Sequence, residues 1–334
     1  MGGTDTFSIG AAQLERLCAA AGLAGGPGRP TGFFRELAPL CRAGESDRPP
    51  RWSAVAEDCT PFEFSIAIRK GGSDLRVLVE AQEDPASPLS YWAAGLRLSD
   101  WLHGRGLVDL SRFRAIEDLF VPAVEHAIWA MWHAFEFRAD GRMLCKLYLN
   151  SHARGRDRAE EVVAAALERL GFARAWPAIR STLGPGRQLS FFSLDLSSGP
   201  HARVKVYSRH PRATFREIDD FCRRSGSAEA GEMEEFCRAM TGEAEAFTGR
   251  PILRVDHLND PDRDRPSRST IYVPLWGYAP TDRVAHDRIQ AFLGQWGLPL
   301  APHADCIRAL AVRPLDEECG IHYYASFARE DGEP

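Results

Sequence analysis

Hydrophobic and polar residues alternate in short runs that recur in pairs along the chain. A polar turn separates the two runs of each pair, and KGGSD is the first of these turns. A period of two is typical of strands, and two such runs joined by a turn predict a β-hairpin. The sequence predicts five hairpins, which pair residues 62–69 with 75–81, 132–138 with 143–150, 188–196 with 202–208, 251–258 with 270–276, and 306–313 with 320–327.

Segments with hydrophobic residues at helical spacing lie between the hairpins. The predicted helices cover residues 11–21, 89–102, 111–131, 156–170, 176–183, 215–224, 231–247 and 281–296, and a Gly/Pro-rich loop at 25–31 precedes another short helix. A hairpin followed by helices therefore recurs five times, with a repeat of roughly 50 to 70 residues.

The repeats predict an α+β fold with one ten-stranded antiparallel sheet, since hairpins pair their strands antiparallel. The edges of such a sheet are exposed unless it closes, and a closed barrel of about ten strands encloses a ligand cavity. We expect one domain over residues 1–334, with N-terminal helices and a loop in 1–50 and the five repeats in 58–328. Helices would lie outside the barrel and the site in its lumen. Two separate α+β domains are the alternative.

Composition and charge change this picture little. The chain has 334 residues and a net charge of -5, and its basic residues form no cluster that predicts nucleic acid as a partner. The N-terminal sequence has no secretory signal pattern, and no apolar run approaches the roughly 18 residues of a membrane span. The eight cysteines show no CxxC spacing. We expect a cytoplasmic protein with reduced, buried thiols and no membrane partner.

Cations and tyrosines share one face of several predicted strands. Side chains two apart on a strand point the same way, so Lys146 and Tyr148 of CKLYLN lie together. Arg203, Lys205 and Tyr207 of RVKVYS form a second set with apolar residues on the opposite face. In each strand the apolar face can pack under helices, which leaves the polar face toward the lumen.

Two further strands extend the pattern. Tyr272 shares a face with Thr270, and Arg76 interrupts an apolar strand. Cations directed into a lumen require an anion, and guanidinium and ammonium groups are natural diphosphate ligands. Tyrosines add hydroxyl groups for phosphate and π-faces that stabilise a carbocation. Solvated cations on edge strands are the alternative.

One acid and one histidine are candidates for acid–base chemistry. Glu63 lies on the face of its strand opposite Phe62 and Phe64. It can accept a hydrogen bond from a substrate N–H, or it can serve a structural role. His133 shares a face with Phe135; it is either a second base or a satisfied core histidine.

Other diphosphate and hydrolase motifs are missing from the sequence. Asp219 and Asp220, and the loop acids Asp260, Asp262 and Asp264, do not form DDxxD, so we interpret them as solvated charges. GxxxxGK[ST], GxSxG and HExxH are absent as well. These observations favour diphosphate binding by cations, without Mg²⁺ or another metal.

The motifs together resemble the dimethylallyltryptophan synthase type of aromatic prenyltransferase. They are TPFEFS at residues 60–65, KLY at 146–148, RVKVY at 203–207 and IYVPLWGYAPTD at 271–282. Their order and spacing extend the resemblance from about residue 58 to the C-terminus, and the chain length is similar to that of bacterial members.

The resemblance implies an αββα barrel that binds dimethylallyl diphosphate and an indole-type N–H aromatic, as a monomer or homodimer and without a required cofactor. It implies that Glu63 binds the indole N–H, that Arg76, Lys146, Arg203 and Lys205 hold the diphosphate, and that Tyr148, Tyr207, Tyr272 and Tyr324 shield the cation. Tyr323 is an alternative to Tyr324. Thr270 and His133 depart from the pattern, where relatives carry a longer amide and founding fungal members carry a lysine.

The implied reaction is a Friedel–Crafts alkylation. Diphosphate leaves, an allylic cation forms, a ring carbon attacks, and Glu63 or His133 removes the ring proton. Tryptophan or another indole-like aromatic is the expected acceptor, with a carbazole, an indole alkaloid or a cyclic peptide as alternatives. A non-catalytic barrel that binds an anionic isoprenoid or lipid is the alternative from another class.

Overall fold

The computed structural model describes residues 6–23, 30–41, 53–56, 58–123, 127–184, 186–199, 202–242 and 244–329. The chain divides into two compact units that interleave in sequence. The first comprises Met1–Ala67, Gly72–Leu170 and Phe191–Ala202, and the second comprises Ile68–Gly71, Gly171–Ser190 and Arg203–Pro334.

The described residues form nine strands in one sheet, whose order follows the chain. The strands are β1 (Phe62–Arg69), β2 (Gly72–Val79), β3 (Met131–Phe137), β4 (Met143–Asn150), β5 (Gln188–Asp195), β6 (Val204–His210), β7 (Ile252–Leu258), β8 (Arg268–Pro274) and β9 (Tyr324–Phe327). The pairs β2–β3, β3–β4, β4–β5, β6–β7, β7–β8 and β8–β9 are all antiparallel, so the mixed α/β class and antiparallel sheet are confirmed.

Helices follow the strands as the periodicity predicted. The α-helices are α1 (Thr6–Ala20), α2 (Pro30–Cys41), α3 (Pro88–Gly104), α4 (Ser111–Arg114), α5 (Ala159–Arg169), α6 (Trp176–Arg180), α7 (Phe215–Arg224), α8 (Glu232–Thr241), α9 (Asp282–Gln295) and α10 (Ala301–Leu310). Short 3₁₀ turns are η1 (Glu117–Phe120), η2 (Arg156–Arg158), η3 (Ala173–Ala175) and η4 (Leu275–Gly277). No helix in these ranges is both long and apolar enough to cross a membrane.

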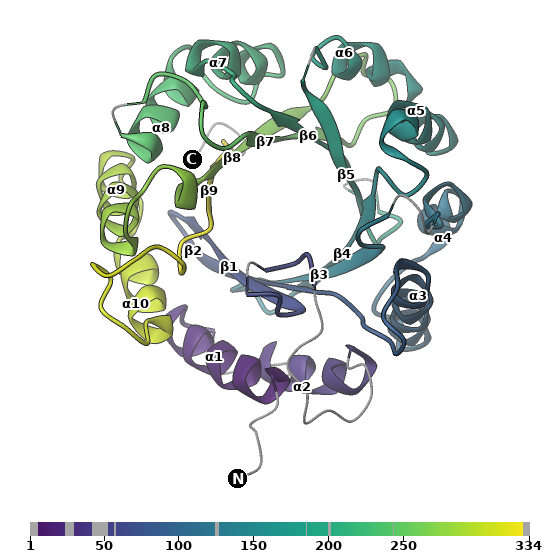
Figure 1. Ribbon diagram of the computed structural model, residues 1–334, viewed down its shortest axis with the longest axis horizontal. Helices are drawn as coiled ribbons and strands as arrows, with labels where there is room; N and C mark the ends of the chain where they lie inside the picture. Colours follow the sequence, from purple (N-terminus) through teal and green to yellow (C-terminus); the bar gives the residue numbers. More distant parts are fainter. Residues whose placement is uncertain are drawn as a thin grey trace. The chain divides into compact units, whose positions relative to one another are not determined.

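In the first unit, helices α3, α4 and α5 lie on one side of strands β3 to β5 (Figure 1). Alternation along the strands explains this layering, because Phe135, Leu147 and Phe192 point into the core and are almost fully buried. Helices α1 and α2 pack on β1 through a cluster of aromatic rings. Phe62 lies 5.6 Å from Phe7 between ring centroids, and both rings are buried.

The second unit repeats the same layering with its own core. In Figure 1, α7, α8 and α9 lie along one side of β6 to β9. Buried residues of those helices, including Ile218 and Phe236, pack with Ile271, Val273 and Phe327 of strands β8 and β9. The apolar side chains of these strands therefore face the helices, and the side chains of alternate residues lie on the opposite face of the sheet.

Two predicted elements are wrong. Residues 306–313, expected as a strand, belong mainly to helix α10, where His303, Cys306 and Ile307 are buried at helical spacing. Residues 111–131 were expected as one helix, but their described part contains only α4 and η1 before strand β3 begins at Met131. A tenth strand is thus not found among the described residues, and most of the predicted 25–31 loop lies outside them.

The eight cysteines form no disulfide, and six of them are buried. Burial raises the pKa of the Cys41 and Cys145 thiols to about 12. The prediction of inert, reduced cysteines is consistent with this burial.

Candidate functional site

Polar side chains gather on the face of β2, β3 and β4 that points away from the helices of the first unit. Arg76 lies opposite Glu136 in the β2–β3 register. Lys146 on β4 forms an ion pair with the same carboxylate, and Arg76 Nε lies 3.2 Å from Glu136 Oε2. The structure therefore brings together two of the four predicted diphosphate ligands.

Glu136 holds this cation cluster together and was missed by the sequence analysis. Its side chain is only 3% exposed and also contacts Arg138, with 3.2 Å between Nε and Oε1. Burial by itself would raise the pKa of Glu136, but the charges of Lys146 and Arg76 lower it well below its usual range. The ionised carboxylate therefore fixes the ends of these cationic side chains by charge-assisted contacts.

Tyr148 lies beside an aromatic cluster on the same face. Trp129 and Trp132 stack with 4.0 Å between ring centroids, and Tyr148 packs against them. The Trp132 indole donates a hydrogen bond of 3.0 Å to Glu80, whose other oxygen accepts from Ser53. Burial raises the pKa of Glu80 to about 7, although both hydrogen bonds act to lower it.

Glu63 lies on strand β1 with its side chain on the face opposite Phe62 and Phe64. Those two rings pack on the N-terminal helices, as the 5.4 Å centroid distance from Phe34 to Phe62 shows. The Glu63 side chain is partly exposed, yet enough protein surrounds it that desolvation raises its pKa to about 7. A carboxyl group with this pKa can change its protonation state near neutral pH.

His133 lies apart from this polar face. It points toward the helix layer, where its Nε2 atom is 2.9 Å from Ser99 Oγ of α3. The side chain is completely buried, and desolvation lowers its pKa to about 3. The structure therefore does not bring His133 together with Glu63, Arg76 or Lys146.

A row of basic side chains crosses the second unit. Lys205 on β6 lies opposite His257 on β7, and His257 lies opposite Arg268 on β8. Lys205 is buried, and Arg203 lies just before the start of β6. His257 and Arg268 were not among the predicted site residues, because only the pairing of strands shows that they lie in one row with Lys205.

Tyrosines follow this basic row on the same face. Tyr207 on β6 lies opposite Val255, while Tyr272 on β8 lies opposite Leu253. Tyr272 and Tyr324 approach to 6.4 Å between ring centroids, and Tyr324 is 37% exposed. The hydroxyl of Thr270 is 3.0 Å from His257 Nε2, so this departure from the family pattern contacts the basic row.

Tyr323, the alternative to Tyr324, lies just before β9 begins, and its ring centroid is 4.7 Å from that of Tyr324. Its ring stacks on Trp276 with 5.7 Å between centroids, and Arg250 covers the Trp276 ring at 3.9 Å. This arrangement favours Tyr324 over Tyr323 as the residue that shares a face with Tyr272.

The predicted solvated acids behave differently from one another. Asp220 pairs with Arg223 on the surface, and Asp262 lies 3.6 Å from Arg174 with its side chain 94% exposed. Asp219 is instead buried and accepts hydrogen bonds from the amides of Gly231 and Met233 at the start of α8. The interpretation of Asp219 as solvated is therefore wrong, because its carboxylate caps a neighbouring helix.

A family model and several solved structures all match this chain and point to the same protein family. The family model described as tryptophan dimethylallyltransferase matches residues 36–305. A 6-dimethylallyl tryptophan synthase is similar, with 32% identity and a TM-score of 0.88 over 98% of this chain and 95% of that chain.

Two further solved structures support the same assignment. The 6-dimethylallyltryptophan synthase from Micromonospora olivasterospora, in complex with DMASPP and Trp, has 31% identity and a TM-score of 0.89 over 98% of this chain and 94% of that chain. The 5-dimethylallyltryptophan synthase from Streptomyces coelicolor has 29% identity and a TM-score of 0.88 over 98% and 94% of the two chains. The resemblance inferred from the sequence motifs is thus confirmed. The chain belongs to the tryptophan dimethylallyltransferase family and is a prenyltransferase.

Proposed function

We propose that this enzyme transfers a dimethylallyl group from dimethylallyl diphosphate to a ring carbon of tryptophan or a close indole analogue. The family match and the similarity to an enzyme solved with DMASPP and Trp support this proposal. The observation that carries it furthest is the convergence of Arg76 and Lys146 on Glu136, on the face that also bears Tyr148.

The proposed fold is an αββα barrel with the site in its lumen. The proposed diphosphate ligands are Arg76, Lys146, Arg203 and Lys205. Fixed cations stabilise the negative charge that develops on diphosphate as the C–O bond breaks. The electron pair of that bond leaves with the diphosphate, and an allylic cation remains. Because the protein supplies these charges, we propose that transfer needs no Mg²⁺ or other cofactor.

The tyrosines have two proposed tasks. Tyr148, Tyr207, Tyr272 and Tyr324 offer π-faces to the allylic cation and exclude water that would otherwise quench it. Their hydroxyl groups can also donate to phosphate oxygens.

Glu63 is the proposed anchor for the acceptor. Its ionised carboxylate accepts a hydrogen bond from the indole N–H, which increases electron density in the ring where a carbon attacks the cation. The new C–C bond leaves a positive charge on the ring, and loss of the ring proton restores aromaticity. We assign this proton to Glu63, because its raised pKa of about 7 suits a base at neutral pH.

His133 is the other predicted base. Replacing it distinguishes a catalytic role from a structural role in the core. Because its imidazole bonds Ser99 in the core, His133→Asn is expected to lower the melting temperature and leave kcat within about threefold of the parent enzyme. Steady-state kinetics below the melting transition measure this. A loss of kcat of more than about 100-fold in a folded variant would make His133 the base instead.

Product analysis tests the proposed function. Purified enzyme is incubated with dimethylallyl diphosphate and tryptophan, with or without EDTA, and the products are examined by mass spectrometry. We expect tryptophan to gain one C5H8 unit in both samples. A panel of indole alkaloids, a cyclic dipeptide and a carbazole tests the other acceptors. Binding of dimethylallyl diphosphate without any prenylated product would favour the non-catalytic isoprenoid binder.

A further inference from the structure

Three histidines from separate elements meet at the C-terminal end of the second unit. His286 lies on α9, His303 lies on α10, and His322 lies two residues before β9 begins. One side-chain nitrogen of each lies within 4.8 Å of the other two. His303 and His322 are buried, whereas His286 is partly exposed. No step of the proposed transfer uses these residues.

Hydrogen bonds orient two of the three rings. Asp282 Oδ1 lies 2.9 Å from His322 Nδ1, so the proton of His322 resides on Nδ1 and its Nε2 lone pair points into the cluster. The Gln290 amide nitrogen Nε2 lies 2.7 Å from His303 Nδ1 and also donates to the Leu300 carbonyl, so His303 Nδ1 accepts in this structure. A carboxylate behind the ligating imidazole, as Asp282 stands behind His322, is an arrangement that supports metal-binding histidines.

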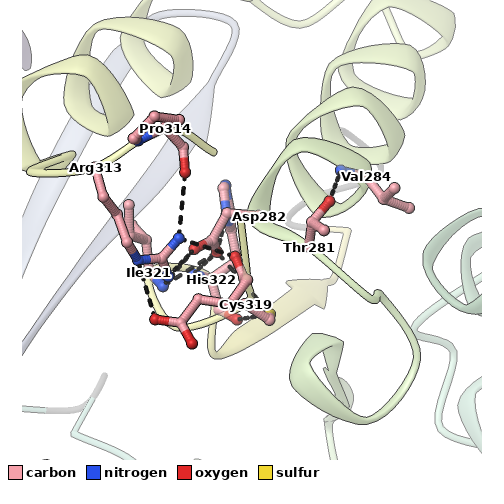
Figure 2. A network of polar contacts seen from close by, with 9 residues as sticks. Thr281, Asp282, Val284, Arg313, Pro314, Cys319, Ile321 and His322 are labelled. Carbon is pink, nitrogen blue, oxygen red and sulfur yellow. Dashed lines mark hydrogen bonds and ion pairs between the residues drawn. The ribbon is translucent and has the colours of Figure 1, made fainter. Parts of the chain in front are cut away.

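The Asp282 carboxylate is itself held firmly. Figure 2 shows it at the centre of a network in which the amides of Ile321 and His322 donate to its oxygens. Arg313 adds an ion pair of 3.1 Å, and the Asp282 side chain is fully buried. The network fixes the His322 ring relative to α9, because Asp282 is the first residue of that helix.

One pair of ring nitrogens in the cluster has the spacing of two metal ligands. His303 Nε2 lies 3.2 Å from His322 Nε2. Two nitrogens bound to a tetrahedral Zn²⁺ at ~2.05 Å are about 3.3 Å apart. The Nδ1 atom of His286 is buried and meets no hydrogen-bond partner in the described part of the chain, which leaves it available to a ligand.

We propose that His286, His303 and His322 form a binding site for a divalent transition-metal ion, with Zn²⁺ the best match. Three neutral imidazoles suit Zn²⁺, Co²⁺ or Ni²⁺, whereas Mg²⁺ and Ca²⁺ require oxygen ligands. Binding requires the three nitrogens, which lie within 4.8 Å of one another, to close to about 3.3 Å. It also requires the Gln290 amide to turn over, so that its oxygen in place of Nε2 faces His303 Nδ1 and accepts its proton. A water molecule completes a tetrahedral set.

A bound metal ion would stabilise the part of the chain next to Tyr324. The ion would join α9, α10 and the segment before β9, and Tyr324 lies two residues beyond His322. Metal binding would thus restrict the strand that carries Tyr324, without taking part in the transfer of the prenyl group. The proposal does not depend on the identity of the acceptor.

Metal titration of the full chain, without either substrate, tests the site. After removal of metal by a chelator and dialysis, we expect one Zn²⁺ to bind per chain in competition with a chromogenic indicator. The melting temperature should rise with Zn²⁺ concentration, since a ligand of the native state stabilises it by mass action. Co²⁺ should give the visible absorption of a tetrahedral site.

A matched pair of variants distinguishes the cluster from surface histidines. His286→Ala should weaken Zn²⁺ binding by more than about 100-fold, since even residues behind the ligands contribute 10- to 100-fold. His103→Ala, an exposed histidine of α3 outside the cluster, should bind as the parent does. Equal affinity in His286→Ala and the parent, or no stoichiometric binding at all, would overturn the proposal. In that case the three histidines are a hydrogen-bonded structural cluster only.

Discussion

Replacing Glu63 by glutamine is expected to lower kcat/KM for tryptophan prenylation by about 100- to 1,000-fold. The change keeps the shape of the side chain but removes the negative charge that receives the indole N–H. It also removes the proposed acceptor for the ring proton. The binding of dimethylallyl diphosphate should persist, because Glu63 is not one of the cations assigned to that substrate.

The pH profile provides a second measurement on the same variant. Burial raises the pKa of Glu63 to about 7, and the ionised form is the one that acts. The kcat/KM of the parent enzyme should therefore rise between about pH 6 and pH 8 and level off above the pKa. Glu63→Gln should lose this rise, since a glutamine side chain does not titrate in that range.

Ser65→Ala is the control for Glu63→Gln. Ser65 lies two residues farther along β1, on the same face as Glu63, and it is exposed. Its replacement should leave kcat/KM and the pH profile unchanged. If Glu63→Gln turns over tryptophan at the parent rate, Glu63 neither anchors the acceptor nor removes its proton.

Local pattern explains which elements could be predicted. Strands β1 to β8 were predicted because each segment shows hydrophobic alternation in its own sequence. The same signal failed at residues 306–313, since a short apolar run satisfies a buried strand and a buried helix equally well. There Cys306 and Ile307 belong to the buried stripe of α10, which begins with a proline in its first turn.

The face of a strand on which a side chain lies was easier to predict than the residue opposite it on the next strand. The phase of Lys146 and Tyr148 along β4 was sufficient to place both on one face. Glu136 was missed because its importance comes from the register, which sets it against Arg76 of a different strand. His257 and Arg268 were missed for the same reason.

The sequence of strand β3 alone could have predicted that His133 faces the helices. Its neighbours two and four residues on are Phe135 and Phe137, which are buried. A histidine in phase with large apolar side chains is expected to face the helices, and Glu136 is out of phase with it. The phase of WHAFEF therefore favoured Glu136, rather than His133, as the residue on the polar face.

Lys146→Met is the second change with a large expected effect, a loss of about 100- to 1,000-fold in kcat/KM. Methionine fills a similar volume but offers no charge to the departing diphosphate. The fold should survive, because Arg76 and Arg138 remain within 3.2 Å of Glu136 and still balance its buried carboxylate. Three measurements separate these effects. Steady-state kinetics give the loss of kcat/KM, a binding assay gives the affinity for dimethylallyl diphosphate, and thermal melting shows whether the fold survives.

Arg138→Met separates diphosphate binding from simple support of Glu136. Arg138 contacts the same carboxylate as Lys146, but it follows the end of β3 and is not a proposed diphosphate ligand. If the loss in Lys146→Met arises from missing charge at the diphosphate, Arg138→Met should retain kcat/KM within about threefold. If it arises from an unbalanced Glu136, the two variants should lose activity and melting temperature alike. Equal losses would assign Lys146 a structural role, whereas a selective loss in Lys146→Met, with the melting temperature preserved, supports diphosphate binding by its ammonium group.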